Sequence, residues 1–198
     1  MCSVHCLRRL LASITLVIAT LWGSPTVSAN TLRTALYDVQ IRKWNSFYTP
    51  SIPWYWNKAQ LMAESRLDTN ATSPVGAMGL GQFMPATWNE VSKQLGFPSG
   101  VSAYASSYNI QAQAYYMRNL RNNFKKERPE RDRHSLALAS YNAGLGNILK
   151  AQQKANNTLL WAPTAKALPM VTGSHAKETT TYVTRIWSYV EQYEHDNN

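Results

Sequence analysis

The sequence predicts an all-α or mainly α protein built as a single domain. Apolar side chains recur at helical spacing within the segments 107–124 and 177–193. No stretch alternates between polar and apolar residues over the length of a strand, and Pro or Gly residues punctuate the periodic segments. The chain has 198 residues, which suits one domain with a substantial hydrophobic core.

The segment 1–29 has the three parts of a secretory signal peptide. Arg8 and Arg9 give a basic start, an apolar or small-residue run covers 10–22, and Ala29 ends a small-x-small cleavage pattern. The run is shorter than the roughly 20 apolar residues that a membrane-spanning helix needs, and an uncleaved anchor is the alternative. We therefore expect export to the periplasm or the medium, without stable membrane insertion, and a mature domain over 30–198.

The composition of the mature chain excludes several classes of site. Cys2 and Cys6 precede the apolar run and would leave with the signal peptide, so neither a thiol nucleophile nor a cysteine-ligated zinc site is expected. The full sequence has seven Trp and eleven Tyr residues, and all but one Trp remain after removal of the signal peptide to supply packing area instead of disulfides. The formal net charge of +9 falls to +7 when Arg8 and Arg9 are removed.

The positive charge predicts affinity for a polyanion. Its densest part, 118–133, holds seven basic residues interleaved with three acidic ones. Such interleaving is typical of a solvated surface rather than of a nucleic-acid groove. For an exported protein we interpret the charge as affinity for the cell wall, expect no nucleic-acid partner, and hypothesise that 118–133 binds a partner.

The first two helices are predicted from their ends. A helix over 54–67 follows Pro53 and stops at the turn-forming residues 68–70. A loop rich in small residues, 73–81, separates it from the next helix. That helix covers 85–95, begins with a proline and is stopped by a glycine.

The remaining helices are predicted mainly from apolar periodicity. A long helix is expected over 107–124, a short one over 134–141, and another from about Asn147. The last helix covers 177–193 and gathers tyrosines on its apolar face. The segment 157–175 contains two prolines and a glycine and is expected to be a loop.

Four short segments concentrate the polar groups that could perform chemistry. In chain order they are ESRLD at 64–68, GAMGLGQFMPATW at 76–88, ALASYNAG at 137–144 and ETTTY at 178–182. Taken singly, each has a structural explanation, such as a helix end with its glycine stop or an acid in the first turn of a helix.

Together and in this order, the four segments resemble the catalytic domain of the soluble lytic transglycosylases. That family also has Glu-Ser near a helix end, a serine before a Gly-Ala-x-Gly-Leu-x-Gln-x-Met-Pro-x-Thr segment, an Ala-x-Ala-x-Tyr-Asn-Ala-Gly helix end, and a Glu-Thr-x-x-Tyr. The resemblance covers about 50–193 and implies a lysozyme-like helical domain with a substrate cleft. Leu67, Thr69 and Gly81 depart from the usual family residues, which puts the fine shape of the groove in doubt.

The resemblance implies that Glu64 is the single catalytic carboxylate. A general acid must be protonated near neutral pH, so the pKa of Glu64 should be raised by apolar surroundings. Other residues are expected to orient Glu64 or to bind substrate: Ser65 and Ser73 by hydrogen bonds to Glu64, Gln82 and Asn142 through their amides, Met84 and Tyr141 as walls, Glu178 through a structural hydrogen bond, and Tyr182 along the groove. For Tyr182, core packing is an equal alternative.

The expected reaction is non-hydrolytic cleavage of peptidoglycan glycan strands. The bond between N-acetylmuramic acid and N-acetylglucosamine would be broken, leaving a 1,6-anhydromuramic end. No cofactor and no metal are expected, because His134, His175 and His195 are scattered and show no ligand spacing. They are interpreted as surface or loop histidines.

Two alternatives stay open. A lysozyme-like peptidoglycan hydrolase would use water and would need a second well-placed carboxylate, for which the sequence offers no obvious candidate. A non-catalytic wall-binding component of a secretion or conjugation assembly would keep the fold without the activity. A small exported enzyme would also suit local wall opening for such a machine or for a phage, an inference by analogy alone.

Overall fold

The computed structural model describes residues 35–196, and the expected signal peptide over 1–29 lies outside them. The described part is helical, with two isolated β-bridges, Thr72 to Met78 and Met78 to Phe83, and no β-strand. No helix in this part is long and apolar enough to cross a membrane. The elements are α2 Asp38–Tyr48, α3 Trp54–Ser65, α4 Pro85–Gln94, α5 Ser106–Arg121, α6 Glu130–Ala143, α7 Leu145–Lys154, α8 Trp161–Ala167, α9 Pro169–Thr172, the 3₁₀ turn Gly173–His175 and α10 Ala176–Asp196.

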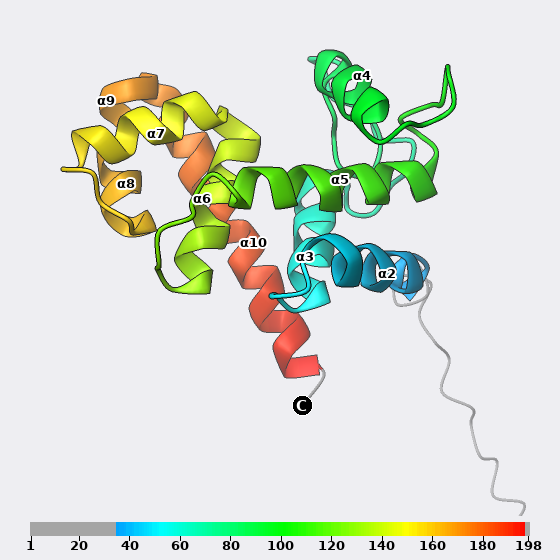
Figure 1. Ribbon diagram of the computed structural model, residues 1–198, viewed down its shortest axis with the longest axis horizontal. Helices are drawn as coiled ribbons and strands as arrows, with labels where there is room; N and C mark the ends of the chain where they lie inside the picture. The colour runs from blue at the N-terminus through cyan, green and yellow to red at the C-terminus, as the bar shows by residue number, and fades with distance from the viewer. Residues whose placement is uncertain (1–34, 197–198) are drawn as a thin grey trace, which may run out of the picture.

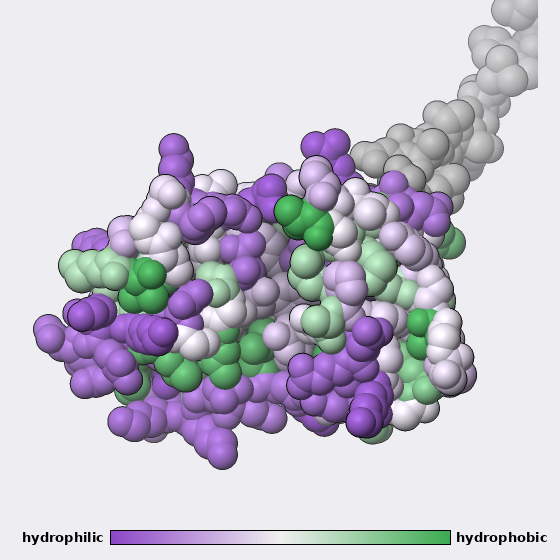
Figure 2. All heavy atoms as spheres, turned by 90° about the horizontal axis from the view of Figure 1, so that it is seen from above, coloured by the Kyte–Doolittle hydropathy of each residue, from purple (hydrophilic) through white to green (hydrophobic). Residues whose placement is uncertain are grey.

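The helices form two groups joined by α5. In Figure 1, α5 crosses the middle of the molecule, with α4 above one end and α7, α8 and α9 gathered at the other. Helix α3 packs against α10 and α2, while α6 packs against α5, α7 and α10. Seen from above in Figure 2, the surface is hollowed between the α4 side and the α7–α9 side.

Helix α3 is deeply embedded in the fold. Six consecutive residues, Trp56–Leu61, are buried, so the helix is covered on all sides rather than along one stripe. The largest core cluster includes Trp56, Ala59, Met117, Leu120, Leu136, Leu138, Ile148, Val183, Ile186 and Trp187, which come from α3, α5, α6, α7 and α10. Polar side chains within the buried stretch of α3 must find partners inside the fold.

The C-terminal end of α3 is shorter than the sequence predicted. The helix stops at Ser65 because Arg66 and Leu67 take left-handed backbone conformations, with φ of 55° and 59°. The N–H of Arg66 caps the helix by donating to Met62 O at 3.0 Å. Leu67 is 1% exposed. Its buried side chain anchors the sharp turn that follows the helix.

The prediction of a loop over 157–175 is wrong. The structure forms α8, α9 and a 3₁₀ turn there. Pro163 lies in the first turn of α8 and Pro169 is the first residue of α9. At these positions a proline lacks no needed N–H donor and its fixed φ suits a helix. The prolines therefore mark helix starts rather than a structureless segment.

Other helix boundaries also differ from the predictions. Helix α6 begins at Glu130, earlier than the predicted 134, directly after Pro129, and α7 begins at Leu145, two residues before the predicted start. Helix α2 was not predicted. It carries a buried face at Ile41, Asn45 and Tyr48 and packs against α3 and α5.

Candidate active site

Glu64 lies in the last turn of α3 and is half-buried. Tyr182, on α10, donates a hydrogen bond from its hydroxyl oxygen to Glu64 Oε1 at 2.5 Å. Only 4% of Tyr182 is exposed. The packing of α10 on α3 thus brings together two motif residues that are 118 positions apart. Tyr182 is both a core side chain and a direct partner of Glu64.

The surroundings of Glu64 change its acidity. Burial raises its pKa from 4.5 to about 7, against the lowering effects of the Tyr182 hydrogen bond and the positive charge of Arg185. Loss of hydration disfavours the charged form, and here it exceeds both opposing effects. A carboxyl group with this pKa is a proton donor and a proton acceptor near neutral pH.

Tyr141, at the end of α6, closes one side of the site. Its hydroxyl donates to Gly81 O at 2.6 Å, and its ring contacts Phe83 and Tyr116 edge-on. Burial raises the pKa of Tyr141 well above its usual range, and the charge of Glu64 raises it further. Tyr141 is therefore an uncharged, largely apolar neighbour of the acid.

The hydroxyl groups of Ser65 and Ser73 have other partners than Glu64. Ser65 Oγ donates to Leu80 O at 2.9 Å, and Ser73 Oγ accepts from Ala77 N at 2.9 Å. The expected direct hydrogen bonds to Glu64 are thus not formed. Consecutive side chains on a helix do not face each other, which explains why Ser65 turns from Glu64 to the loop. Both serines shape the loop beside the acid.

Gln82 also stabilises the loop. Its Nε2 donates to Gly79 O at 2.9 Å and to Ala71 O at 3.1 Å, and its φ is 49°. The amide nitrogen expected to meet a sugar is thus engaged with backbone carbonyl groups. Met84, directly before α4, is 44% exposed. It offers an apolar surface to a ligand rather than a buried wall.

Asn109 holds the same loop from the other side and was not among the predicted site residues. It is 0% exposed, accepts from Gly81 N at 2.7 Å and donates to Ala103 O at 2.7 Å. Gly79 makes this contact possible, because a Cβ there would lie 2.2 Å from Ala103 O. The sequence offered a weaker hint, because Asn109 and Ile110, which open the long middle helix, resemble a minor feature of the same family.

Asn142 and Glu178 meet at a pocket of about 360 Å³. Asn142 Oδ1 accepts from Thr179 Oγ1 at 2.7 Å, while Glu178 is exposed. The remaining lining residues are Ala143, Asn147, Val171, Thr172 and His175. The third and fourth motifs, which lie on α6 and α10, are therefore joined next to a surface cavity.

The groups that move the pKa of Glu64 do not include a second carboxylate. Asp68, four residues later in the chain, accepts from Asn70 N at 3.0 Å, as expected for a turn residue. Glu90 is exposed and accepts from Gln94 Nε2 on its own helix. In the part of the chain that the structure describes, no second carboxylate is thus among the groups that shift the pKa of Glu64.

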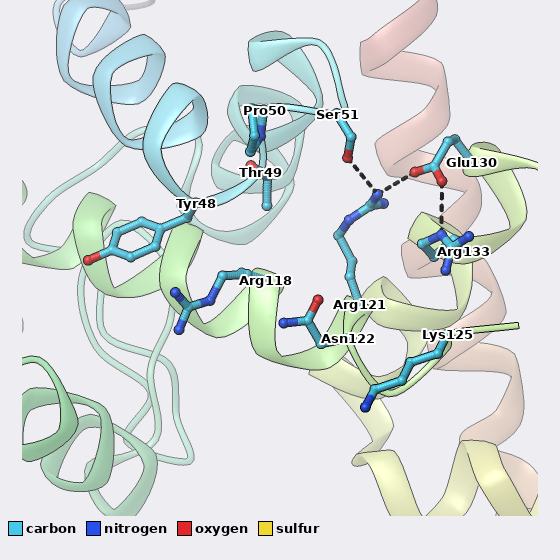
Figure 3. Close-up of a pocket in the computed structure, with 10 residues that line it drawn as sticks. All are labelled: Tyr48, Thr49, Pro50, Ser51, Arg118, Arg121, Asn122, Lys125, Glu130 and Arg133. Carbon is cyan, nitrogen blue, oxygen red and sulfur yellow. Dashed lines mark hydrogen bonds and ion pairs between the residues drawn. The ribbon is translucent and has the colours of Figure 1, made fainter.

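The basic region 118–133 forms a separate pocket of about 270 Å³ between the α2–α3 turn and α6 (Figure 3). Arg121 is 6% exposed and donates to Ser51 Oγ at 3.3 Å and to Glu130. Arg133 Nε also donates to Glu130, at 2.9 Å. These charges are largely engaged within the fold, whereas Lys125 is exposed at the rim.

The interpretation of His134 as a surface or loop histidine is wrong. It is 0% exposed and contacts the rings of Trp56 and Trp187. Burial, reinforced by the nearby Arg121, lowers its pKa well below the usual value, so the ring is neutral. Within 35–196, no group of three or more His, Cys, Asp or Glu residues is arranged to hold a metal ion.

Comparisons with known proteins find a family match over a range that contains the first three motifs. A family described as the transglycosylase SLT domain matches residues 48–162. Membrane-bound lytic murein transglycosylase F of Shewanella halifaxensis is 31% identical over 128 residues, which are 63% of this chain and 26% of the relative. The protein of the same name from Desulfosudis oleivorans is 32% identical over 134 residues, 65% of this chain and 28% of the relative. The chain spans about a quarter of the length of these relatives.

Solved structures share the fold. Lytic transglycosylase Slt from Pseudomonas aeruginosa, an inactive mutant, has a TM-score of 0.66 and 25% identity over 85% of this chain and 25% of that chain. The 70-kDa soluble lytic transglycosylase in complex with bulgecin A has a TM-score of 0.65 and 22% identity over 85% and 26%. The predicted lysozyme-like helical fold is confirmed. Because the family match covers more than half of its length, this chain belongs to the transglycosylase SLT domain family.

Proposed function

We propose that this protein is an exported lytic transglycosylase that cleaves peptidoglycan glycan strands, with Glu64 as its catalytic acid and base. The observation that carries the proposal is the state of Glu64, whose pKa is raised to about 7 by burial. A hydrolase of the usual two-carboxylate type would need a second acid beside it. The family match supports the same class of reaction.

In the proposed reaction, protonated Glu64 gives its proton to the oxygen that links N-acetylmuramic acid to N-acetylglucosamine. The bond from the muramic C1 to that oxygen breaks as positive charge develops at C1. The Glu64 carboxylate then takes the proton of the muramic C6 hydroxyl while the C6 oxygen forms a bond to C1. The product is a 1,6-anhydromuramic end, no water is consumed, and Glu64 returns to its protonated form.

The surrounding residues support the two proton transfers in different ways. Tyr182 donates to Oε1 of Glu64 and stabilises the carboxylate after the first transfer. Tyr141 limits hydration without adding charge. We assign Met84, Asn142 and Glu178 to contacts with the glycan, because Met84 is exposed beside the loop and the other two line the neighbouring pocket. Ser65, Ser73 and Gln82 act by holding the loop.

Export follows from the segment 1–29, in which a basic start, an apolar run and a small-x-small site succeed one another. Fractionation of expressing cells, followed by N-terminal sequencing, tests this part. We expect a mature protein that begins after Ala29 in the periplasm or the medium. A full-length protein in the membrane fraction would show an uncleaved anchor instead.

The decisive experiment is mass spectrometry of the muropeptides that the protein releases from purified sacculi. Glu64→Gln is run in parallel, with Glu194→Gln as the control because Glu194 is an exposed acid outside the motifs and outside region 118–133. We expect anhydro products, lighter by one water than hydrolytic ones, from the wild type and Glu194→Gln, and none from Glu64→Gln.

Other outcomes would overturn the proposal in distinguishable ways. Reducing ends instead of anhydro ends would identify a hydrolase that uses water. Binding to sacculi without release of muropeptides, under conditions in which a known wall-lytic enzyme works, would identify a non-catalytic component of an envelope assembly.

A further inference from the structure

A row of buried polar side chains leads from Glu64 into the interior of the fold. Tyr182 Oη donates to Glu64 Oε1 at 2.5 Å and accepts from Gln60 Nε2 at 3.1 Å. Gln60 Oε1 in turn accepts from Gln113 Nε2 at 2.5 Å. The row therefore joins α10, α3 and α5 behind the carboxyl group.

The two glutamines lie completely inside the fold. Gln60 and Gln113 are each 0% exposed. A buried amide destabilises the folded state unless it is hydrogen-bonded, and apolar side chains of similar size would avoid that cost. Burying two amides between α3 and α5 therefore costs more folding free energy than burying two apolar side chains would. A role in the site offers a reason for their presence.

The orientation of the row follows from a backbone carbonyl group at its far end. Ile52 O can only accept, and Asn45 Nδ2 donates to it at 3.0 Å, which turns Asn45 Oδ1 towards Asn57. Asn57 Nδ2 donates to Asn45 Oδ1 at 2.7 Å. Asn57 consequently presents its own Oδ1 to Gln113 Nε2, 3.5 Å away. No amide in this part can be reversed without placing two acceptors or two donors face to face.

The same constraint continues to the site. Gln113 Nε2 faces the carbonyl oxygens of both Asn57 and Gln60. Gln60, whose oxygen accepts, is left with its Nε2 for Tyr182. Tyr182, which accepts from Gln60, is left to donate its hydroxyl proton to Glu64. From Gln113 through Gln60 and Tyr182, each link donates towards Glu64, and hydrogen bonds aligned in one direction polarise and strengthen one another.

We propose that Gln60 and Gln113 are positioning residues for the reaction at Glu64. They fix the Tyr182 hydroxyl as a donor to Oε1, which leaves Oε2 to exchange the proton with the substrate. The inference rests on the proposed function, in which Glu64 is the catalytic acid. Neither glutamine touches the substrate in this proposal. They act by setting which way the Tyr182 hydrogen bond points.

The row of hydrogen bonds also counteracts the rise in the pKa of Glu64 that burial causes. A donor at Oε1 favours the ionised carboxyl group, so weakening that donor should raise the pKa of Glu64 further. Two other groups act electrostatically with Glu64, Arg185 on α10 and Tyr141 on α6. Both are retained in the variants below, so a change in acidity can be assigned to the row.

Gln60→Met tests the proposal, with Gln152→Met as the matched control. Methionine keeps the volume of glutamine and removes the amide. Gln152 is also buried, at 9% exposed, but it lies on α7 and donates to Thr158 O. Carbon NMR of carboxyl-labelled glutamates follows the titration of Glu64, whose signal is assigned by its loss in Glu64→Gln. The pH profile of muropeptide release and the thermal unfolding of each variant are measured alongside.

We expect Gln60→Met to raise the pKa of Glu64 and to move the alkaline limb of activity upward by about half a pH unit, since a neutral hydrogen bond is being weakened. Gln113→Met should act in the same direction with a smaller shift. Gln152→Met should lose stability without moving either quantity. Equal pKa values and equal pH limbs in Gln60→Met and Gln152→Met would show that Gln60 only fills space.

A double variant tests whether Gln60 acts on the pKa of Glu64 through the Tyr182 hydroxyl group. Tyr182→Phe removes the donor itself, so adding Gln60→Met to it should produce no further shift of the pKa. An equal shift in the Tyr182→Phe background would overturn the proposed path through the hydroxyl group. The titration needs no activity. A Glu64→Gln variant that still released anhydro products would therefore overturn the proposed function, while the NMR result would remain a test of the row.

Discussion

Glu64 and Glu130 are two glutamates in one small domain whose environments have opposite effects. Glu64 meets a phenol and apolar surroundings, and burial raises its pKa to about 7. Burial would also raise the pKa of Glu130, but hydrogen bonds from Arg121 and Arg133 outweigh that effect and leave the pKa lowered. The first carboxyl group can carry a proton near neutral pH. The second is held ionised as half of an ion-pair network.

The comparison teaches that a cavity lined with charges need not be the reactive one. The pocket formed by region 118–133, here called the Arg121 pocket, gathers the densest positive charge. Glu130 and neighbouring oxygen atoms nevertheless accept hydrogen bonds from its guanidinium groups. Within residues 35–196, the hydrogen bond to Glu64 comes from the neutral Tyr182 hydroxyl and not from a guanidinium group. We therefore place the proposed reaction at Glu64, the group whose charged form is poorly stabilised.

The largest expected difference between the two glutamates is in activity. Glu64→Gln should lower the release of anhydro muropeptides by at least about 100-fold, because a missing general acid typically costs that much. Glu130→Gln should retain activity at temperatures where it is folded. Quantifying anhydro ends per hour for both variants checks this, and similar losses in the two would break the comparison.

The second-largest expected difference between the two glutamates is in how each makes stability depend on pH. The pKa of Glu64 is raised above its ordinary 4.5. Its contribution to stability is therefore full below about pH 4.5 and is lost as the pH rises through about 7. Between these pH values the wild type should lose up to about 3 kcal/mol relative to Glu64→Gln. Urea unfolding of both proteins at several pH values measures this difference, and parallel curves would refute the raised pKa.

The contribution of Glu130 to the free energy of unfolding should have the opposite pH dependence and should be smaller. Glu130→Gln leaves the buried Arg121 without its carboxylate, at a cost of about 1–2 kcal/mol, reduced because 43% of the Glu130 side chain is exposed. The pKa of Glu130 is lowered, so this contribution is present above its unfolded value and is lost as the pH falls through the folded one. Unfolding at pH 7 and at pH 3 distinguishes a pH-dependent loss from a constant one.

The smallest effect concerns the rim of the Arg121 pocket. Lys125→Glu reverses an exposed charge and should weaken binding to sacculi a few-fold at low salt, with the difference vanishing as salt screens it. Anhydro-product formation from a soluble glycan fragment should be unchanged. Co-sedimentation with sacculi at two ionic strengths is the measurement. If binding does not change, the hypothesis that region 118–133 contacts the wall is removed.

The sequence predicted which tyrosines lie near Glu64 better than it predicted the hydrogen bonds of the serines and glutamines. Tyr141 and Tyr182 lie within recognisable motifs, and both lie close to Glu64 in the structure. The roles of Ser65 and Ser73 were harder to infer, because their hydroxyl groups can reach several acceptors or donors and only the loop conformation selects among them. Gln60 and Gln113 gave no local signal, since a buried glutamine on a helix has the same sequence appearance as an exposed one.

The fold shows the same division. Apolar periodicity predicted α5 and α10, because a helix that buries one stripe must repeat it every three or four residues, whereas α3 and α4 were predicted from their end signals. The short helices over 161–172 were missed, since a proline near the start of a helix and a proline in a loop look alike without the tertiary context.

The sequence by itself determined the helical class and the order of the motifs, because these depend on local spacing along the chain. The family resemblance of those motifs then indicated Glu64 as the candidate acid. Tertiary structure alone decided the chemistry of that acid. The packing of α10 on α3 supplies the Tyr182 donor, and the burial that raises the pKa of Glu64 arises from segments distant in sequence. A pKa depends on which groups surround a carboxyl group in space, and those groups are chosen by how the helices pack.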